Sequence, residues 1–245
     1  MVLPNYARME LSFSNFSRLL GSERCFNGIQ QEESSELRID FNRFSSARFS
    51  HRILSNIQQF HRSFFHLSLS NFNYLTIERT FLDDVIQSNS SMIISIINQT
   101  NSLCLTNETL TNLIQENHSI FQLEIHSGEN ILFPSGAVRY LTVKSHSKFV
   151  IDIVHCYDTY FSKYSLTNFT QFDHASIDIR IKFGQNLIFE TDAIDRVDMF
   201  TSSRFTIAFQ YSRGTFQMAM NAFSRINQGN IQYYRRRYSF IYFSR

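Results

Sequence analysis

The sequence predicts an α+β protein: an irregular leucine-rich-repeat-like region of strands and helices, followed by antiparallel β-hairpins. A recurring apolar spacing from residue 64 onward and one segment with helix-capping residues predict the first part. Strict alternation of apolar and polar residues after residue 175 predicts the hairpins. We therefore divide the chain into an N-terminal region (1–63), a repeat-like strand and helix region (64–174) and an antiparallel β region with a basic tail (175–245).

The N-terminal region has the weakest pattern. Ile53, Ile57 and Phe60 have the spacing of one helix face. We therefore expect this region to contain helix.

The repeat-like region carries the pattern apolar, two residues, apolar, one residue, apolar. It begins at Phe64, Ile120 and Val138, with a partial copy after Thr100. Between two copies, segment 106–114 combines capping-type residues with apolar residues at helical spacing. Strand, short helix and strand in about 20 residues is the rhythm of a leucine-rich repeat. Ordinary mixed α+β packing is the alternative.

The C-terminal region alternates most clearly. Segments 175–189 and 204–222 each contain two alternating runs separated by a turn with Gly184 or Gly214. Glycine at such a turn is typical of a β-hairpin. Segment 231–243 is expected to add one more edge strand or hairpin.

Composition excludes several classes of protein. Hydrophobic residues make up 43% and charged residues 18% of the chain, which argues against intrinsic disorder. The last 47 residues carry seven arginines and no acidic residue, whereas the preceding 198 carry 16 basic and 21 acidic residues. The chain is thus predicted to be a mildly acidic body with a basic end.

The cysteines and apolar runs predict an intracellular protein, cytoplasmic or nuclear. Cys25, Cys104 and Cys156 are widely spaced and form no disulfide or zinc pattern, so we expect reduced, buried thiols. The first 20 residues lack the apolar core of a signal peptide. The longest apolar run, 92–97, is far shorter than the roughly 18 residues of a membrane span, so no membrane partner is expected.

No motif predicts catalysis. The seven isolated glycines exclude the usual phosphate loops, and no zinc-protease or serine-hydrolase motif occurs. Asp83 and Asp84 are adjacent, so their side chains diverge, and both are expected in solvent. His155 and Cys156 diverge for the same reason. We expect no catalytic residue, no cofactor and no metal, and therefore no enzyme.

One cluster near the C-terminus combines aromatic rings with arginines. Guanidinium groups that hold phosphates beside rings that stack on bases suit single-stranded nucleic acid. The alternative, which we favour, is a basic edge strand or terminal tail whose charges prevent edge-to-edge pairing. The cluster comprises Tyr233, Tyr234, Arg235, Arg236, Arg237 and Tyr238.

Two stretches resemble the nematode F-box-associated (type 2) domain. Segment 192–198, followed by 204–210, is similar in order and hydrophobicity to that family's D-I-R-R-x-D-G-x-x-A-T-I motif. Segment 165–172 resembles its L-T-N-x-D-x-N-x-F motif without the Asp, and 138–144 resembles the strand before it. No F-box is evident in residues 1–60. Three helices there would indicate a diverged one.

The resemblance implies a protein-interaction role. The first hypothesis is a non-catalytic module that recognises an unknown protein substrate for a cullin-type ubiquitin ligase. A Skp1-like adaptor is a partner only if the N-terminal region is a diverged F-box. The binding surface is expected on exposed strands or loops between Phe64 and Phe172. Nucleic-acid binding by the basic aromatic cluster is the second hypothesis.

Overall fold

The chain folds as a parallel β-solenoid with a period of 28 residues. The computed structural model describes residues 1–211, 215–227, 230–236 and 238–244, with the backbone alone for 99, 183, 211 and the last two ranges. Strands of successive coils pair in parallel, for example Val2 with Gln30 and Leu110 with Val138. Within these ranges there is no helix. The predicted α+β class with leucine-rich-repeat-like helices is therefore wrong.

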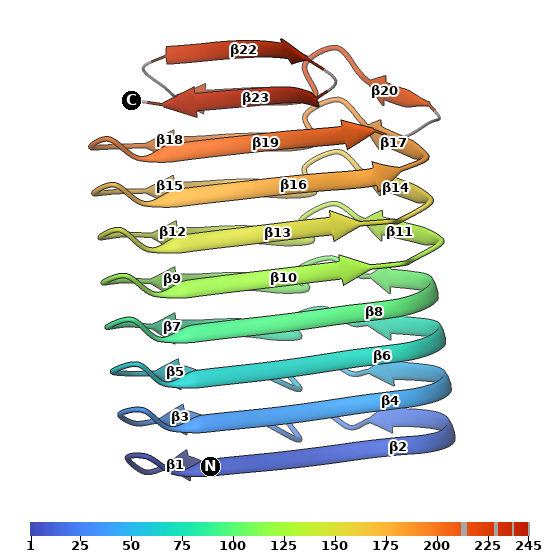
Figure 1. The fold of residues 1–245 in the computed structure, drawn as a ribbon, viewed down its shortest axis with the longest axis vertical. Helices are drawn as coiled ribbons and strands as arrows, with labels where there is room; N and C mark the ends of the chain where they lie inside the picture. The colour runs from blue at the N-terminus through green and yellow to red at the C-terminus, as the bar shows by residue number, and fades with distance from the viewer. Residues whose placement is uncertain (212–214, 228–229, 237, 245) are drawn as a thin grey trace.

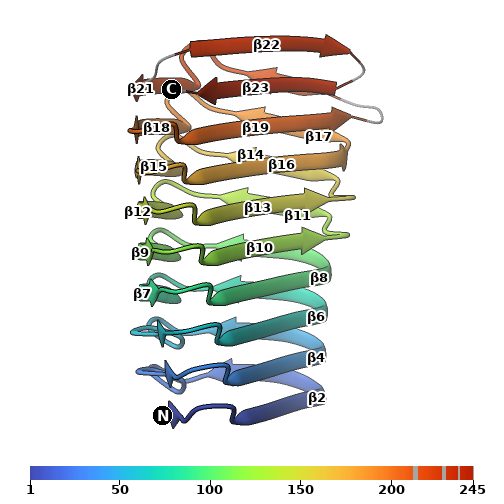
Figure 2. The same ribbon diagram turned by 60° about the vertical axis from the view of Figure 1, so that its left-hand side comes forward.

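The first of two sheets receives one short strand from each coil. Its nine strands lie in chain order along the solenoid (Figures 1 and 2). They are β1 (Val2–Leu3), β3 (Gln30–Gln31), β5 (Gln58–Gln59), β7 (Leu82–Gln87), β9 (Leu110–Gln115), β12 (Val138–Val143), β15 (Leu166–Gln171), β18 (Ile194–Met199) and β21 (Phe223–Asn227).

The second sheet wraps around a corner of the coil (Figure 1). In the early coils a single strand of 14 residues covers both sides of the corner: β2 (Arg8–Gly21), β4 (Glu36–Phe49), β6 (Phe64–Ile77) and β8 (Met92–Leu105). Later coils divide it into pairs: β10 (Ile120–His126) and β11 (Asn130–Phe133), β13 (Lys148–Val154) and β14 (Asp158–Phe161), β16 (Ser176–Gly184) and β17 (Asn186–Phe189), β19 (Arg204–Tyr211) and β20 (Phe216–Met218).

The chain reverses direction at the C-terminal end. Here β22 (Asn230–Arg236) and β23 (Tyr238–Ser244) pair antiparallel, and β23 pairs antiparallel with β19. The hairpins predicted over 175–189 and 204–222 are wrong. β16 pairs with β13 and β19, and β17 with β14 and β20, all in parallel. Alternation identifies a strand and its two faces but not its partner, and the Gly184 turn is a corner of the coil.

Interior side chains stack on their counterparts in the next coil. The ring of Phe161 lies 4.6 Å from that of Phe133 and 4.5 Å from that of Phe189, and all three rings are nearly parallel. A single coil cannot bury its own apolar face, so each coil is covered by its neighbours. The 28-residue period therefore carries the core.

A buried ladder of glutamine amides runs along the first sheet. The Nε2 atom of Gln59 donates to Oε1 of Gln31 at 2.8 Å, Gln87 donates to Gln59 at 3.0 Å, and Gln115 donates to Gln87 at 3.2 Å. Each of these amides also donates to a main-chain carbonyl of the second sheet. Buried amides are stable only when hydrogen-bonded, so the ladder ties coil to coil and sheet to sheet.

The ladder breaks in the later coils. Val143 and Met199 occupy the ladder position on either side of Gln171. Neither amide atom of Gln171 has a hydrogen-bond partner in the described structure, and Oε1 of Gln115 has none either. A buried unpaired amide costs free energy, so this is a local defect in the stack.

A β-bulge explains the helix wrongly predicted at 106–114. Asn112 has a φ of 51° within β9, and Leu110 and Leu113 on either side of it are both buried. The bulge shifts the alternation by one residue, so inward residues fall three apart, as on a helix. The N-terminal region likewise contains β1 to β5 instead of helix, and so lacks the three helices that an F-box would require.

The repeat was missed because the apolar pattern occurs in both sheets. The copies at Phe64 and Ile120 are two coils apart, and both pair with Met92 of β8. The copy at Val138 lies in the first sheet. Comparing strands from different sheets produced unequal spacings and hid the 28-residue period.

Candidate functional site

A column of left-handed residues runs along the first sheet and its corner. At each position the chain bulges, and φ lies between 47° and 70°. Glycine, asparagine and aspartate tolerate this conformation best, and the first four coils use them. The later coils retain asparagine only at Asn168 and otherwise use larger or charged side chains. The bulge column comprises Gly28, Asn56, Asp84, Asn112, Tyr140, Asn168, Arg196 and Arg225.

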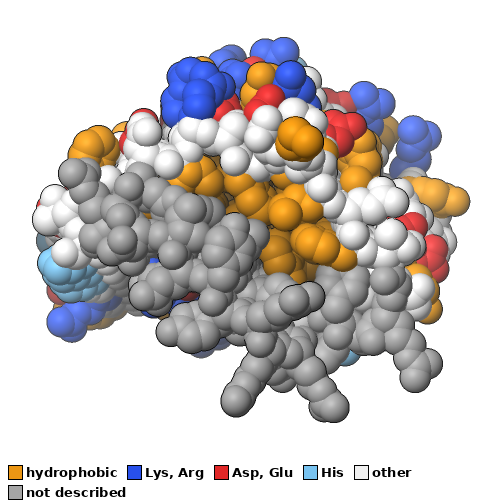
Figure 3. All heavy atoms as spheres, turned by 90° about the horizontal axis from the view of Figure 1, so that it is seen from above, with side chains coloured by type: hydrophobic (Ala, Val, Ile, Leu, Met, Phe, Trp, Pro, Cys, Tyr) orange, Lys and Arg blue, Asp and Glu red, His pale blue; other side chains and the backbone are white. Residues whose placement is uncertain are grey.

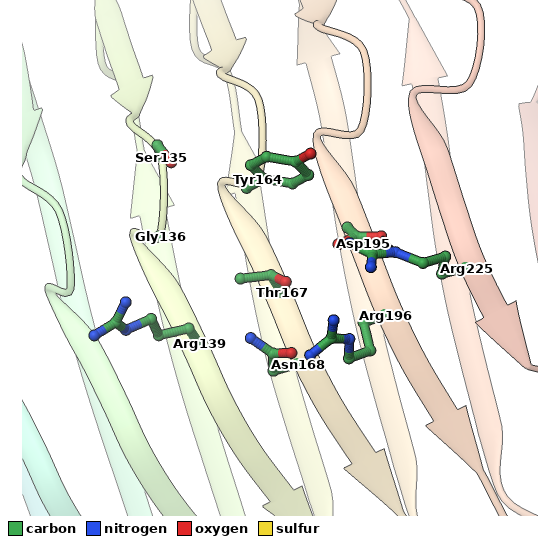
Figure 4. Close-up of a pocket in the computed structure, with 9 residues that line it drawn as sticks. All are labelled: Ser135, Gly136, Arg139, Tyr164, Thr167, Asn168, Asp195, Arg196 and Arg225. Atoms are coloured by element: carbon green, nitrogen blue, oxygen red, sulfur yellow. Dashed lines mark hydrogen bonds and ion pairs between the residues drawn. The ribbon is translucent and has the colours of Figure 1, made fainter.

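An open pocket lies over this column between β12 and β21 (Figure 4). Its volume is about 270 Å³. Three arginines from three different coils reach it, against one aspartate, and we call it the arginine pocket. The lining residues are Ser135, Gly136, Arg139, Tyr164, Thr167, Asn168, Asp195, Arg196 and Arg225.

Asp195 and Arg225 form the fixed side of the arginine pocket. The Nε atom of Arg225 donates to Oδ1 of Asp195 at 2.7 Å, and its Nη2 donates to Oδ2. Ser224 Oγ donates to Oδ1 at 2.8 Å. Burial opposes ionisation of Asp195, but hydrogen bonds from Arg225 and Ser224 together with the guanidinium charge outweigh it and lower its pKa. This carboxylate therefore stays charged and holds Arg225 in place.

Arg139 forms the opposite side of the pocket, and only some of its hydrogen-bond donors have a partner. Its Nη2 lies 2.5 Å from Oε1 of Glu108, on the preceding coil. Its Nε is buried and has no hydrogen-bond partner in the described structure. The guanidinium also lies over the ring of Tyr140, 4.9 Å from the centroid. The Arg139 side chain is 32% exposed, so its guanidinium charge faces the pocket although the Nε atom itself is buried.

Arg196 lies between these two sides. It is exposed, and within the described residues it has neither a hydrogen bond nor an ion pair. Its guanidinium points toward Asn168 (Figure 4), and Thr167 lies beside Asn168 in β15. An unpaired guanidinium fork next to an amide and a hydroxyl suits a carboxylate or another oxyanion.

The predicted basic aromatic cluster lies elsewhere. Tyr233 to Arg236 are in β22 and Tyr238 is in β23, whereas Arg237 lies outside the described residues. The side chains of this whole segment also lie outside the described part of the structure. None of the six residues lines the arginine pocket.

Two other predictions are corrected in part. Asp84 is exposed, but Asp83 is buried and accepts hydrogen bonds from Thr111 Oγ1 at 2.8 Å and Asn112 Nδ2 at 3.0 Å. The two side chains diverge, but only Asp84 is in solvent. Asp83 joins its coil to the next one.

The cysteines also differ from the expectation of three buried thiols. All three are free, but Cys25 and Cys104 are exposed. Only Cys156 is buried, and burial raises the pKa of its thiol to about 11.

The arginine pocket was missed because its residues are far apart in the sequence. A 28-residue comparison would have aligned Asn112, Tyr140, Asn168 and Arg196 in one column. The same comparison would have found three histidines that stack on one edge, His118, His146 and His174, with ring centroids 5.0 and 4.9 Å apart. In the described chain no group of His, Cys, Asp or Glu could hold a metal ion.

The fold and pocket define a parallel β-solenoid with a cationic site on its first sheet. No family model, curated protein or solved structure matches the chain. Among the described residues, no helix of sufficient length and apolarity to cross a membrane is present.

Proposed function

We propose that the chain is a non-catalytic protein-interaction module that binds an acidic segment of a protein partner at the arginine pocket. The observation that carries the proposal is the unpaired guanidinium of Arg196 beside Thr167 and Asn168. Arg139 contributes a second, partly exposed guanidinium charge, and the ion pair of Arg225 with Asp195 supports the site.

The spacing of the arginines suggests the form of the ligand. Arg139 and Arg196 belong to strands that are two steps apart, β12 and β18, so their backbones are separated by roughly 10 Å. Two acidic side chains three residues apart on a polyproline II segment lie on the same face and are separated by about 9 Å, close to this distance. We therefore expect the motif acidic, two residues, acidic. A Skp1-like adaptor is not part of this proposal, because residues 1–63 form strands.

Fluorescence anisotropy with a labelled peptide tests the proposal. The probe is a short polyproline II peptide with two glutamates three residues apart, and its glutamine version is the matched ligand control. We expect the glutamate peptide to bind and Arg196→Ala to weaken it by about tenfold or more, because a hydrogen bond to a charged group is lost.

Arg52→Ala is the matched protein control. Arg52 is exposed and lies between β4 and β5, far from the pocket over β12 to β21. Equal affinity for the glutamate and glutamine peptides would contradict the proposal. Unchanged affinity of Arg196→Ala would contradict it as well.

Nucleic-acid binding is the second candidate, and one observation favours it. β23 pairs with β19, so the C-terminal basic segment extends the sheet that also carries Lys148, Arg180 and Arg204. These three cations surround one carboxylate, Asp178, at 3.1 to 3.5 Å. Arg235 and Arg236 lie toward the Phe209 end of β19, and Arg204 lies at the other end. A labelled single-stranded oligonucleotide tests this candidate. Affinity should fall steeply with salt and be lost on combined alanine substitution of Arg235, Arg236 and Arg237. No loss would eliminate it.

A further inference from the structure

The long strands at the two ends of the solenoid differ in their backbone pairing. At the C-terminal end the long strand β19 is covered by β23. At the N-terminal end β2 pairs only with β4 in the described structure, so one edge of a 14-residue strand has no backbone partner. β2 contains neither proline nor lysine, the residues that commonly protect an edge strand.

The interior of the first coil is also open. Met9 and Leu11 of β2 are only half-buried, whereas their counterparts in β4, Leu37 and Ile39, are 0% exposed. Phe16 is stacked on Phe44 from one side and remains 58% exposed. This surface has the character of an internal coil interface that lacks its second coil.

We infer that this end binds a second copy of the chain head to head, with the two β2 edges antiparallel about a twofold axis. The open face of the first coil has the shape of one coil cross-section. The matching surface is therefore the same face of another copy. A head-to-tail arrangement would place β2 on the outer edge of β22, which has only seven residues, whereas head to head the 14 residues of one β2 face the 14 of the other. The head-to-head arrangement uses the same patch on both copies and closes as a dimer.

The C-terminal end also carries an apolar surface beside the hairpin. Figure 3 looks onto this end and shows apolar side chains in its centre. Phe216, Met218 and Met220 are exposed there. They lie in and after the short strand β20, which offers only three residues of edge. The outer strand β22 of the hairpin has seven residues, so the 14-residue β2 edge is the longest open edge at either end in the described structure.

Charge on β2 is complementary in the antiparallel arrangement. Glu10 lies on one arm of the bent strand and Arg18 on the other, and both are exposed. Antiparallel pairing places the arm that carries Glu10 along the partner arm that carries Arg18, twice by symmetry. Arg8, on the same arm as Glu10, is held within its own copy by Glu36 at 3.5 Å. The two arms therefore attract each other.

Sedimentation velocity of the 245-residue chain, run over a range up to about 100 µM, tests the inference, because oligomerisation depends on concentration. We expect a species of twice the 28.9 kDa chain mass and nothing larger. Glu10→Arg and Arg18→Glu should each weaken the dimer by about tenfold, because like charges then face each other. The double variant should restore dimerisation.

The double variant distinguishes loss of the contact from loss of folding, because a misfolded chain would not regain dimerisation. All these side chains are exposed, and circular dichroism checks that each variant is folded. Arg79→Glu, two coils away, is the matched control and should leave the dimer intact. A monomer at every concentration would overturn the inference. Growth beyond the dimer would overturn it too, as would a double variant no better than the singles.

Discussion

The early and late coils share one fold but differ in what holds successive coils together. From Gln31 to Gln115 every coil repeats the same buried amide bond, and the bulge column contains small residues that suit a left-handed backbone. In the late coils Val143 and Met199 break the ladder, and arginines enter the bulge column. The comparison teaches that the interior period maintains the solenoid, while the outer bulge positions are free to acquire a site.

Charged contacts on the outside join successive coils in both halves of the solenoid, and Arg48 with Glu78 is an early example. Arg225 and Asp195 join β21 to β18, and Lys182 lies 3.2 Å from Asp152 across β16 and β13. Exposed ion pairs contribute little, so most of these contacts cannot equal a buried ladder. Asp195 and Asp178 are exceptions because their side chains are only 3% and 4% exposed.

The largest effect should come from removing one ladder amide in the early coils. Gln87→Leu leaves Oε1 of Gln59, Nε2 of Gln115 and the carbonyl of Ile120 without their partner. We expect a loss of about 2–4 kcal/mol in the free energy of unfolding, because buried polar groups become unsatisfied. Denaturation by guanidinium chloride measures the difference.

The matched variant in the late coils should behave in the opposite way. Gln171→Leu removes a buried amide that already lacks partners, so we expect a gain of about 1–3 kcal/mol. If both variants are destabilised equally, the late ladder position is not defective and the distinction between early and late coils fails.

A smaller loss should follow from Asp195→Asn in the late coils. The variant keeps the shape but removes the charge that fixes Arg225, at an expected cost of about 1–2 kcal/mol at neutral pH. The pKa of Asp195 is lowered in the folded chain, so its contribution is present above the unfolded pKa and is lost as pH falls through the folded pKa.

The difference between wild type and Asp195→Asn should therefore shrink in acid, as thermal melts at several pH values would show. Asp173→Asn, at an exposed turn, is the control and should change little. A penalty for Asp195→Asn that is independent of pH would show that shape, not charge, holds this contact.

The smallest perturbation is chemical labelling of the thiols. With iodoacetamide at about pH 8, Cys25 and Cys104 should react, whereas Cys156 should not, because only the thiolate is nucleophilic. Mass spectrometry of the peptides measures this. Rapid labelling of Cys156 under native conditions would indicate that the late coils open locally, and would sharpen the contrast with the early coils.

Local patterns in the sequence identified strands but misjudged their neighbours. The alternation of Ile177, Ile179 and Ile181 predicts the inward face of β16, and all three are buried. The same alternation is compatible with a hairpin or a solenoid, because side-chain direction in a strand does not depend on which strand lies beside it. Leu110 and Leu113 predicted a helix because a bulge imitates helical spacing.

The arginine pocket could not be found from local patterns at all. Arg139, Thr167 and Arg196 are 28 or 29 residues apart and meet only because the coils stack in register. No motif of adjacent residues marks such a site. Only alignment of the chain with itself at a spacing of 28 could have placed them in neighbouring strands.

The sequence by itself determined the strands of the late coils, their inward faces and the uneven charge, because these depend on the order of neighbouring residues. The tertiary structure alone decided the parallel pairing, the glutamine ladder, the open β2 edge and the arginine pocket. Each of these arises from contacts between residues one or more coils apart, and the free energy that selects them comes from stacking coils on one another.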